Sequence, residues 1–176
     1  ADVDNVATLL RLSSLLPAGL DIAPLLAEAK LQLREEADYL REAEQMRRYG
    51  TLLAGNPAFV VPAPLPELSS ERILAMDFIP GVPIDTLQAA DQPTRDQAMG
   101  AMLGLVLREL FEFGFMQTDP NFANYRWQPE TGRIVLLDFG AARPIPAATV
   151  AAYRRLMLAG LADDSTALKA ALLEVG

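Results

Sequence analysis

The chain contains no cysteine and no histidine, and only two of its basic residues are lysines, Lys30 and Lys169. Without cysteine the chain forms no disulfide and offers no thiolate, a pattern typical of proteins in a reducing compartment. Without histidine it cannot carry a Ser-His-Asp triad, a histidine general base or a histidine-ligated zinc ion. These absences exclude several common nucleophilic and zinc sites.

Long apolar runs and an excess of positive charge are also missing. No apolar stretch approaches the roughly 18 residues of a membrane-spanning helix, and the first residues show no basic segment followed by an apolar one, as a signal peptide would. The formal net charge of −8 argues against nucleic acid as a partner, because nucleic-acid phosphates bind basic surfaces. With 51% hydrophobic and 22% charged residues, the composition is typical of a globular protein with a proper core.

Apolar spacing, proline and glycine divide the chain into helices and short extended segments. The spacing predicts helices over residues 3–16, 22–54, 93–113 and 146–161, and a last helix that begins at Asp164 or Ser165. Extended segments are expected over 73–78, 115–117, 124–127 and 134–137. The last two are separated by Pro129 to Gly132, which is typical of a hairpin turn whose glycine is left-handed.

The most informative pattern is an Asp, an Asn five residues later, and an Asp-Phe-Gly beyond the hairpin: Asp119, Asn124 and Asp138. A hairpin brings its two ends together, so Asn124 and Asp138 should lie side by side. Their oxygen atoms suit a hard cation such as Mg²⁺, with nucleotide phosphates completing its coordination. Asp119, one loop earlier, is placed to accept a hydroxyl proton or to position water. This order and spacing are those of a kinase-type phosphoryl-transfer site.

Each motif alone has a simpler interpretation. Asp-Phe-Gly is common where a strand enters a turn, and Asp119-Pro120 is a common way to open a turn. We favour the functional interpretation because the two motifs occur together, in the correct order, with a hairpin between them.

The residues around this pattern resemble the UbiB/ADCK group of atypical protein-kinase-like proteins. The resemblance rests on Gln-Thr-Asp-Pro-Asn at 117–121 and Leu-Asp-Phe-Gly-Ala-Ala-Arg at 137–143, and it extends to residues 111–116, 78–83 and the Glu-Ala-Asp-Tyr at 36–39. It implies an α+β, protein-kinase-like fold, with a mainly helical C-lobe and a small remnant of the N-lobe. The implied division is an N-lobe remnant over 1–76, a hinge over 77–82 and the C-lobe over 83–176.

The resemblance also implies roles for single residues. Asp119 takes the role of the catalytic-loop acid, and Asn124 and Asp138 take the roles of the metal ligands. Glu36 would be the helix acid that pairs with a nucleotide-gripping lysine, and Asp38 its family-specific neighbour; without the resemblance, both would be interpreted as solvated helix charges. Adenine would hydrogen-bond to the backbone of a hinge that contains Met76, Asp77, Phe78 and Ile79.

The implied function is Mg-ATP binding, with ATPase or unorthodox kinase activity that supports ubiquinone or related prenyl-lipid metabolism. The implied partners are a nucleotide and, beyond it, prenyl lipids or enzymes of the ubiquinone pathway, with peripheral association with a membrane and without nucleic acid. The implied location is intracellular: the bacterial cytoplasm at the inner membrane, or a mitochondrial or plastid compartment.

The chain departs from an ordinary kinase in the parts that grip phosphate. Lys30 lies on a different face of the expected helix from Glu36, Lys169 belongs to the last helix, and no glycine-rich phosphate loop occurs. We therefore expect the chain to be a C-terminal piece whose N-lobe lysine and nucleotide loop lie before Ala1. We also expect weak or no catalysis from this piece alone.

The catalytic loop departs from ordinary protein kinases as well. Gln117 stands where those enzymes carry histidine, and Asn121 stands where they carry lysine. Both changes weaken the case for phosphorylation of protein hydroxyls. They favour ATP hydrolysis or a small, lipid-like acceptor.

Two alternative functions stay open. One is a non-catalytic, kinase-like scaffold that recruits enzymes of lipid biosynthesis, although the intact Asp119, Asn124 and Asp138 set argues against it. The other is a small-molecule phosphotransferase of the aminoglycoside or choline kinase kind. Such enzymes share the Asp, the Asn and the later Asp, but the flanking residues fit the UbiB/ADCK group better.

Overall fold

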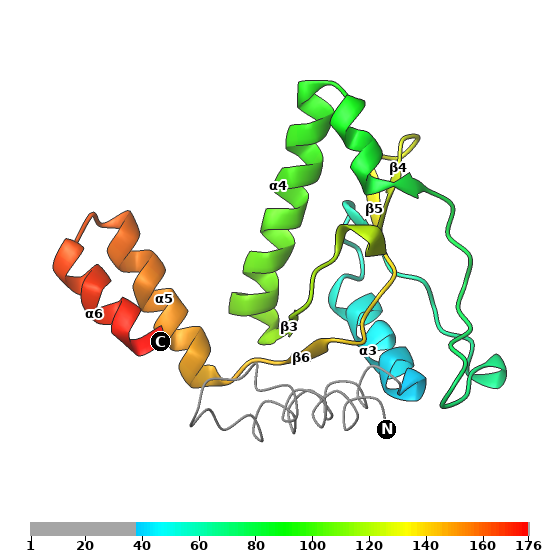
Figure 1. Ribbon diagram of the computed structural model, residues 1–176, viewed down its shortest axis with the longest axis horizontal. Coiled ribbons are helices and arrows are strands. Elements are labelled where there is room, and N and C mark those ends of the chain that lie inside the picture. Colours follow the sequence, from blue (N-terminus) through cyan, green and yellow to red (C-terminus); the bar gives the residue numbers. More distant parts are fainter. Residues whose placement is uncertain (1–37, 176) are drawn as a thin grey trace, which may run out of the picture.

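The computed structural model describes residues 38–175, and Figure 1 shows how their elements are arranged. The helix expected over 3–16, the first part of the helix expected over 22–54, and Glu36 lie outside the described residues. The longer helices are α3 (Tyr39–Leu52), α4 (Gln92–Arg108), α5 (Ala147–Leu161) and α6 (Ser165–Val175). The short helices are η1 (Pro66–Leu68), η2 (Ile84–Ala89), η3 (Glu109–Phe113) and η4 (Phe122–Asn124). The strands are β1 (Phe59–Val60), β2 (Val82–Pro83), β3 (Phe115–Gln117), β4 (Tyr125–Gln128), β5 (Arg133–Leu136) and β6 (Ala142–Pro144).

A four-stranded sheet has the order β1-β5-β4-β2. Its β4–β5 hairpin confirms the prediction from the sequence, and Gly132 turns it with a φ of 65°. The Gly132 N–H donates to the Gln128 carbonyl at 2.8 Å, which closes the turn. β1 pairs in parallel with β5, and β2 pairs antiparallel with β4. The sequence does not predict β1 or β2, because two-residue strands carry no readable alternation.

Helix α3 begins later than the sequence predicts. Asp38 is not helical, and its Oδ1 accepts the Arg41 N–H at 3.0 Å as the N-cap of the helix. The prediction of one unbroken helix over 22–54 is therefore wrong at Asp38, which is a capping residue; residues 22–37 lie outside the described part of the chain. The buried face of α3 carries Ala43, Met46 and Tyr49, at the spacing of one helical stripe.

Helix α4 continues into a π-helical turn. The helix predicted over 93–113 is present, but its last five residues, Glu109–Phe113, take the wider π geometry. Gly114 ends the element in a left-handed conformation with φ 57°. The π turn directs Glu109 inward, where its side chain is buried.

The strand predicted over 73–78 is wrong. In its place the chain is extended and forms only isolated bridges, from Pro64 to Met76 and from Ser70 to Ile73. The partner segment contains Pro62, Pro64 and Pro66, which lack the N–H groups of a ladder. A continuous strand pair therefore cannot form there.

Three aromatic side chains form the centre of the core. The Tyr49 ring of α3 lies 5.5 Å from the Phe115 ring of β3 and 5.0 Å from the Phe139 ring, centroid to centroid. All three side chains are almost fully buried. β3 pairs antiparallel with β6, so the segments that flank the catalytic loop and the Asp-Phe-Gly loop are joined directly. The extended segment predicted over 115–117 is confirmed.

Helices α5 and α6 form an antiparallel pair at one side of the molecule (Figure 1). α5 begins directly after Pro146, as predicted. Asp164 caps α6, since its Oδ1 accepts the Thr166 and Ala167 N–H groups. Over the described residues, no helix combines the length and apolar character needed to cross a membrane.

Candidate active site

Asn124 and Asp138 meet across the β4–β5 hairpin, as the sequence predicts. Asn124 ends η4 immediately before β4, and Asp138 follows β5 by two residues. The Asn124 Nδ2 donates to the Asp138 Oδ2 at 2.7 Å, and the Leu137 N–H donates to the Asn124 carbonyl at 3.1 Å. The two side chains of the predicted metal site are therefore held in direct contact by the local fold.

The loop itself fixes the orientation of the Asp138 carboxylate. Its Oδ1 accepts the Gly140 N–H at 2.9 Å, while its Oδ2 accepts the Asn124 amide. Both hydrogen bonds hold the carboxylate at an exposed position, open to a ligand. A carboxylate aligned in this way needs little reorganisation to bind a cation.

Asp119 is joined to the same loop through Gln117. The Gln117 Oε1 accepts the Asp119 N–H at 3.4 Å, and the Gln117 Nε2 donates to the Asp138 carbonyl at 3.2 Å. One buried carboxamide thus contacts the backbone of both aspartates. The neighbouring Thr118 Oγ1 donates to the Ala141 carbonyl at 2.9 Å, which adds a second tie between the two loops.

The donor set suits a hard cation such as Mg²⁺. It consists of the Asp138 carboxylate and the Asn124 carboxamide. The oxygen and nitrogen atoms of a carboxamide have nearly the same shape and exchange places when the group rotates by half a turn. A half-turn of the Asn124 amide presents its oxygen to the space beside Asp138. Among the described residues, no group of three or more Asp, Glu, His or Cys side chains could hold a metal alone. Phosphate oxygens would therefore have to complete the coordination.

Glu42 belongs to the site, although the sequence reasoning missed it. It lies on α3, and its Oε1 accepts the Phe139 N–H of the Asp-Phe-Gly loop at 3.3 Å. Burial raises the pKa of Glu42 above its usual range; the Phe139 N–H opposes this, and the negative charge of Asp138 adds to it. Its position could have identified Glu42 from the sequence. Glu42 lies on the same helical stripe as Met46 and Tyr49, where an apolar residue is expected.

Arg41, beside Glu42 on α3, binds backbone carbonyl groups of the same Asp-Phe-Gly loop. The Arg41 guanidinium donates to the Gly140 carbonyl at 3.1 Å and to the Ala142 carbonyl at 3.3 Å. Helix α3 therefore contacts this loop through a hydrogen-bond acceptor, the Glu42 carboxyl group, and through hydrogen-bond donors, the Arg41 guanidinium N–H groups. Together these contacts define the position of the loop relative to α3.

Of the two helix acids that the resemblance implies, the structure describes only Asp38, and it does not bring Asp38 into the site. Asp38 is exposed, and it caps α3 through the Arg41 N–H. Glu36 lies outside the described residues. The role that the sequence assigns to either residue stays a prediction.

The predicted hinge runs beside the strand that leads away from Asn124. The Asp77 N–H donates to the Ala63 carbonyl at 3.0 Å, and Met76 bridges Pro64. Phe78 is 90% exposed. The backbone of Phe78 and Ile79 therefore lies past the last bridge to the proline-rich segment.

Two side chains of β4 hold the later residues of this hinge. The Gln128 Nε2 donates to the Pro80 carbonyl at 2.8 Å, and the Arg126 guanidinium donates to the Gly81 carbonyl at 3.5 Å. β2 then pairs with β4. The hinge segment and Asn124 thus share one strand as their support.

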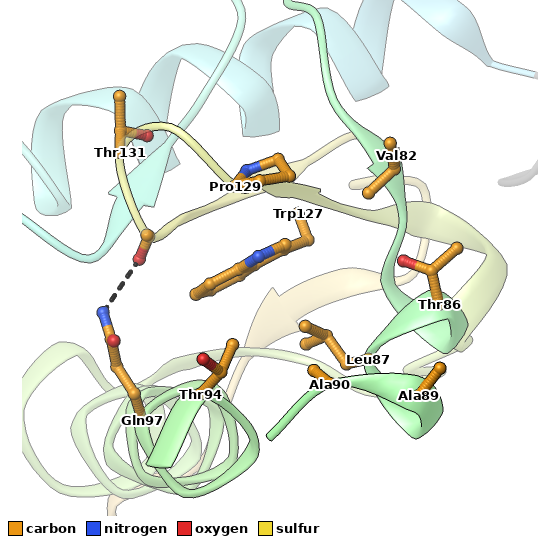
Figure 2. A pocket seen from close by; sticks show the side chains of 11 residues that line it. Val82, Thr86, Leu87, Ala89, Ala90, Thr94, Gln97, Trp127, Pro129 and Thr131 are labelled. Carbon is orange, nitrogen blue, oxygen red and sulfur yellow. Dashed lines mark hydrogen bonds between the residues drawn. The ribbon is translucent and has the colours of Figure 1, made fainter. Parts of the chain in front are cut away.

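A cavity of about 620 Å³ lies on another face of the same hairpin (Figure 2). The Trp127 ring projects into it, and residues of β2, η2 and α4 complete its walls. The Gln97 Nε2 of α4 donates to the Gly132 carbonyl at 3.2 Å at one side of this cavity. Because side chains alternate along a strand, Trp127 and Arg126 face opposite sides of β4. None of Asp119, Asn124 and Asp138 lines this cavity, so it is separate from the predicted metal site.

Comparisons with known proteins agree with this geometry. A sequence profile of the ABC1 atypical kinase-like domain matches residues 1–172. The chain is 42% identical over 170 residues to the mitochondrial atypical kinase COQ8B of Danio rerio, covering 96% of this chain and 27% of that protein. It is 39% identical over 157 residues to the mitochondrial atypical kinase COQ8 of Saccharomyces cerevisiae, covering 89% of this chain and 31% of that protein. The chain thus spans about a third or less of the curated relatives that it matches.

A solved structure shows the same fold. The structure of Rv3197 from Mycobacterium tuberculosis, in complex with erythromycin, matches with a TM-score of 0.70 and 23% identity, covering 97% of this chain and 43% of that chain. The protein-kinase-like α+β fold and the resemblance to the UbiB/ADCK group are therefore both confirmed. The chain belongs to the family of ABC1 atypical kinase-like domains.

Proposed function

We propose that the chain is the Mg-ATP-binding part of an atypical kinase or ATPase that supports ubiquinone or related prenyl-lipid metabolism. The observation that carries this proposal is the contact between Asn124 and Asp138 at 2.7 Å, because these two residues have the order and spacing of the metal-binding residues of a kinase. The link from Asp138 through Gln117 to Asp119 adds the acid of the catalytic loop. Names of relatives as atypical kinases support the same reaction class.

In this proposal Asn124 and Asp138 hold Mg²⁺ together with the nucleotide phosphates. The bound ion would neutralise negative charge on the transferring phosphoryl group. Asp119 accepts a proton from an acceptor hydroxyl or orients a water molecule. The backbone of Met76, Asp77, Phe78 and Ile79 is the proposed adenine contact. Among these, the Asp77 N–H already donates to the Ala63 carbonyl, so Phe78 and Ile79 offer the more accessible groups.

Glu42 is a second candidate, beside Glu36, for the helix acid that pairs with a phosphate-gripping lysine. It lies on α3, contacts the Phe139 N–H and faces the charge of Asp138. A lysine ammonium between Glu42 and the phosphates would offset the unfavourable burial of this carboxylate. The only lysine of the described part of the chain is Lys169, on α6, so it does not fill this role. Glu36 keeps its proposed role as the helix acid of the family motif, and Asp38 its proposed role as the neighbour of Glu36.

We propose the same lobe division as the resemblance implies, with an N-lobe remnant over 1–76, a hinge over 77–82 and a C-lobe over 83–176. We also propose peripheral association with a membrane and partners among prenyl lipids or enzymes of the ubiquinone pathway. Relatives named as mitochondrial and chloroplastic support a mitochondrial or plastid compartment as the location. The bacterial cytoplasm at the inner membrane is the alternative location that we propose.

The proposal is tested by equilibrium binding of Mn²⁺-ATP, with free Mn²⁺ measured by electron paramagnetic resonance. We expect weak but measurable binding by the chain, and at least about a tenfold loss of affinity in Asp138→Asn, because a metal ligand contributes at least as much as the groups that orient it. The matched control is Glu130→Gln, which removes one exposed negative charge in the hairpin turn. Equal binding by the Asp138→Asn and control variants would contradict the proposal. Absence of binding by the unmodified chain and by its natural full-length protein would favour the scaffold alternative.

A further inference from the structure

A buried carboxyl group lies behind the catalytic loop. Glu109 is 3% exposed and Tyr49 is 1% exposed, and the Tyr49 hydroxyl donates to the Glu109 Oε1 at 2.6 Å. Glu109 begins the π-helical turn η3, and Tyr49 lies on α3, so the hydrogen bond joins two elements that are far apart in the sequence. Wide π turns inside helices occur frequently at functional sites.

This pair is costly as a purely structural contact. Burial raises the pKa of Glu109 and that of Tyr49, because both charged forms lose water. Replacing a buried polar pair by apolar residues of similar volume is often neutral or stabilising. The position of the pair between α3 and the catalytic segment suggests what the carboxyl group does instead.

Glu109 reaches the catalytic segment through the backbone of Gln117. The backbone N–H of Gln117 lies near the Glu109 carboxyl group and lowers the pKa of Glu109, which partly offsets the effect of burial. The side chain of the same Gln117 donates to the Asp138 carbonyl and accepts the Asp119 N–H. One residue therefore connects Glu109 to both aspartates of the candidate active site.

The connection returns to α3 through the Asp-Phe-Gly loop. The Phe139 N–H donates to Glu42, and the Phe139 ring packs against the Tyr49 ring. Glu42 and Tyr49 lie on one stripe of α3, about two turns apart. The contacts form a closed circuit that runs from α3 through Glu109, Gln117 and the Asp138 loop back to α3.

We propose that Glu109 is a positioning residue that couples helix α3 to the loops of Asp119 and Asp138. Its carboxyl group accepts the Tyr49 hydroxyl of α3, and its own turn, η3, leads directly into β3 and the catalytic segment, so a displacement of α3 moves both loops together. The proposal rests on the proposed function for the meaning of those two loops, but the coupling itself exists without nucleotide. It predicts that loosening the Tyr49–Glu109 contact is felt at Phe139, although neither partner bonds to that amide.

The test is backbone amide hydrogen exchange of the chain, measured by NMR without nucleotide. Tyr49→Phe removes only the donor hydroxyl, and Glu109→Gln replaces an acceptor by a group that also donates. We expect the Gln117 and Phe139 amides to exchange roughly threefold to tenfold faster in both variants, the change that loss of about one hydrogen bond produces. The Gly132 amide of the hairpin should keep its rate. The controls Tyr153→Phe and Glu112→Gln, both outside the circuit, should leave all these rates unchanged.

A third variant separates coupling from a general loss of stability. Gln117→Met keeps the backbone N–H and removes both carboxamide hydrogen bonds. It should accelerate exchange at Phe139, and adding it to Glu109→Gln should produce no further acceleration there, because both act on one path. Unchanged exchange at Phe139, or a uniform acceleration that includes Gly132, would overturn the proposal. Coupled exchange in a chain that binds no Mn²⁺-ATP would support the positioning role and contradict the proposed function alone.

Discussion

Removing the Glu42 side chain should lower the stability of the fold more than neutralising its charge does. In Glu42→Ala the Phe139 N–H loses its acceptor, while the Phe139 residue is 1% exposed. An unsatisfied buried donor costs about 1–3 kcal/mol. In Glu42→Gln the side chain keeps an oxygen of the same reach, and it no longer carries a charge that burial and Asp138 disfavour. We therefore expect Glu42→Gln to lie within about 0.5 kcal/mol of wild type or to be more stable.

Urea denaturation followed by circular dichroism measures the difference. The free energy of unfolding of Glu42→Ala should fall by about 1–3 kcal/mol at constant m-value, and its Tm by a few degrees. Glu44→Ala is the matched control, because Glu44 is exposed on the same helix and pairs with Arg47 at 2.6 Å. A surface pair of this kind contributes between zero and about 1 kcal/mol. Equal stabilities of Glu42→Ala and Glu42→Gln would refute the assigned hydrogen bond.

The pH dependence gives a second check on Glu42. The folded-state pKa of Glu42 is raised above the unfolded value of 4.5, so the native state binds more protons between the two values. Wild-type stability should therefore rise as the pH falls through the folded pKa, and this gain should be complete below the unfolded pKa. Glu42→Gln lacks this contribution, so its advantage over wild type should be largest at neutral pH and shrink on acidification. The opposite trend would show that Glu42 is stabilised as a carboxylate.

Three further substitutions test the supports of the site by thermal unfolding. Gly132→Ala should destabilise by about 1–2 kcal/mol, because φ is 65° and a Cβ would lie 2.8 Å from the Gln97 Nε2; an unchanged Tm would contradict the left-handed turn. Phe139→Ala should cost about 3–5 kcal/mol through loss of core packing, and a loss below 1 kcal/mol would show that its ring is not in the core. Asp164→Ala should cost about 1 kcal/mol as a lost helix cap, with local fraying of α6 visible by hydrogen exchange; unchanged protection of α6 would argue against the cap.

The contact between Asn124 and Asp138 was predictable from the sequence because it is set locally. A short hairpin with a left-handed Gly132 fixes the register of its two strands, and the two residues flank it. These parts of the site depend on residues that are close together in the chain.

The remaining contacts could not be predicted, because they join distant segments. Glu42 reaches the Phe139 N–H across 97 positions, and Tyr49 reaches Glu109 across 60. Their only sequence signal is a polar residue at an apolar position of a helix, which does not name a partner. The break at Asp38 shows the converse error, since continuous helical spacing hid a capping residue.

The central claim is that Asn124 and Asp138 bind the metal of a nucleotide complex, and paramagnetic broadening by Mn²⁺-ATP tests it most directly. In ¹H–¹⁵N spectra of the chain, the signals of Asn124, Asp138 and Gly140 should broaden at the lowest concentration of Mn²⁺-ATP, while those of α6 should stay sharp. In Asp138→Asn the signals of these three residues should no longer broaden before the others. Broadening that begins instead at the exposed acids around Asp163, or that is unchanged in Asp138→Asn, would contradict the account.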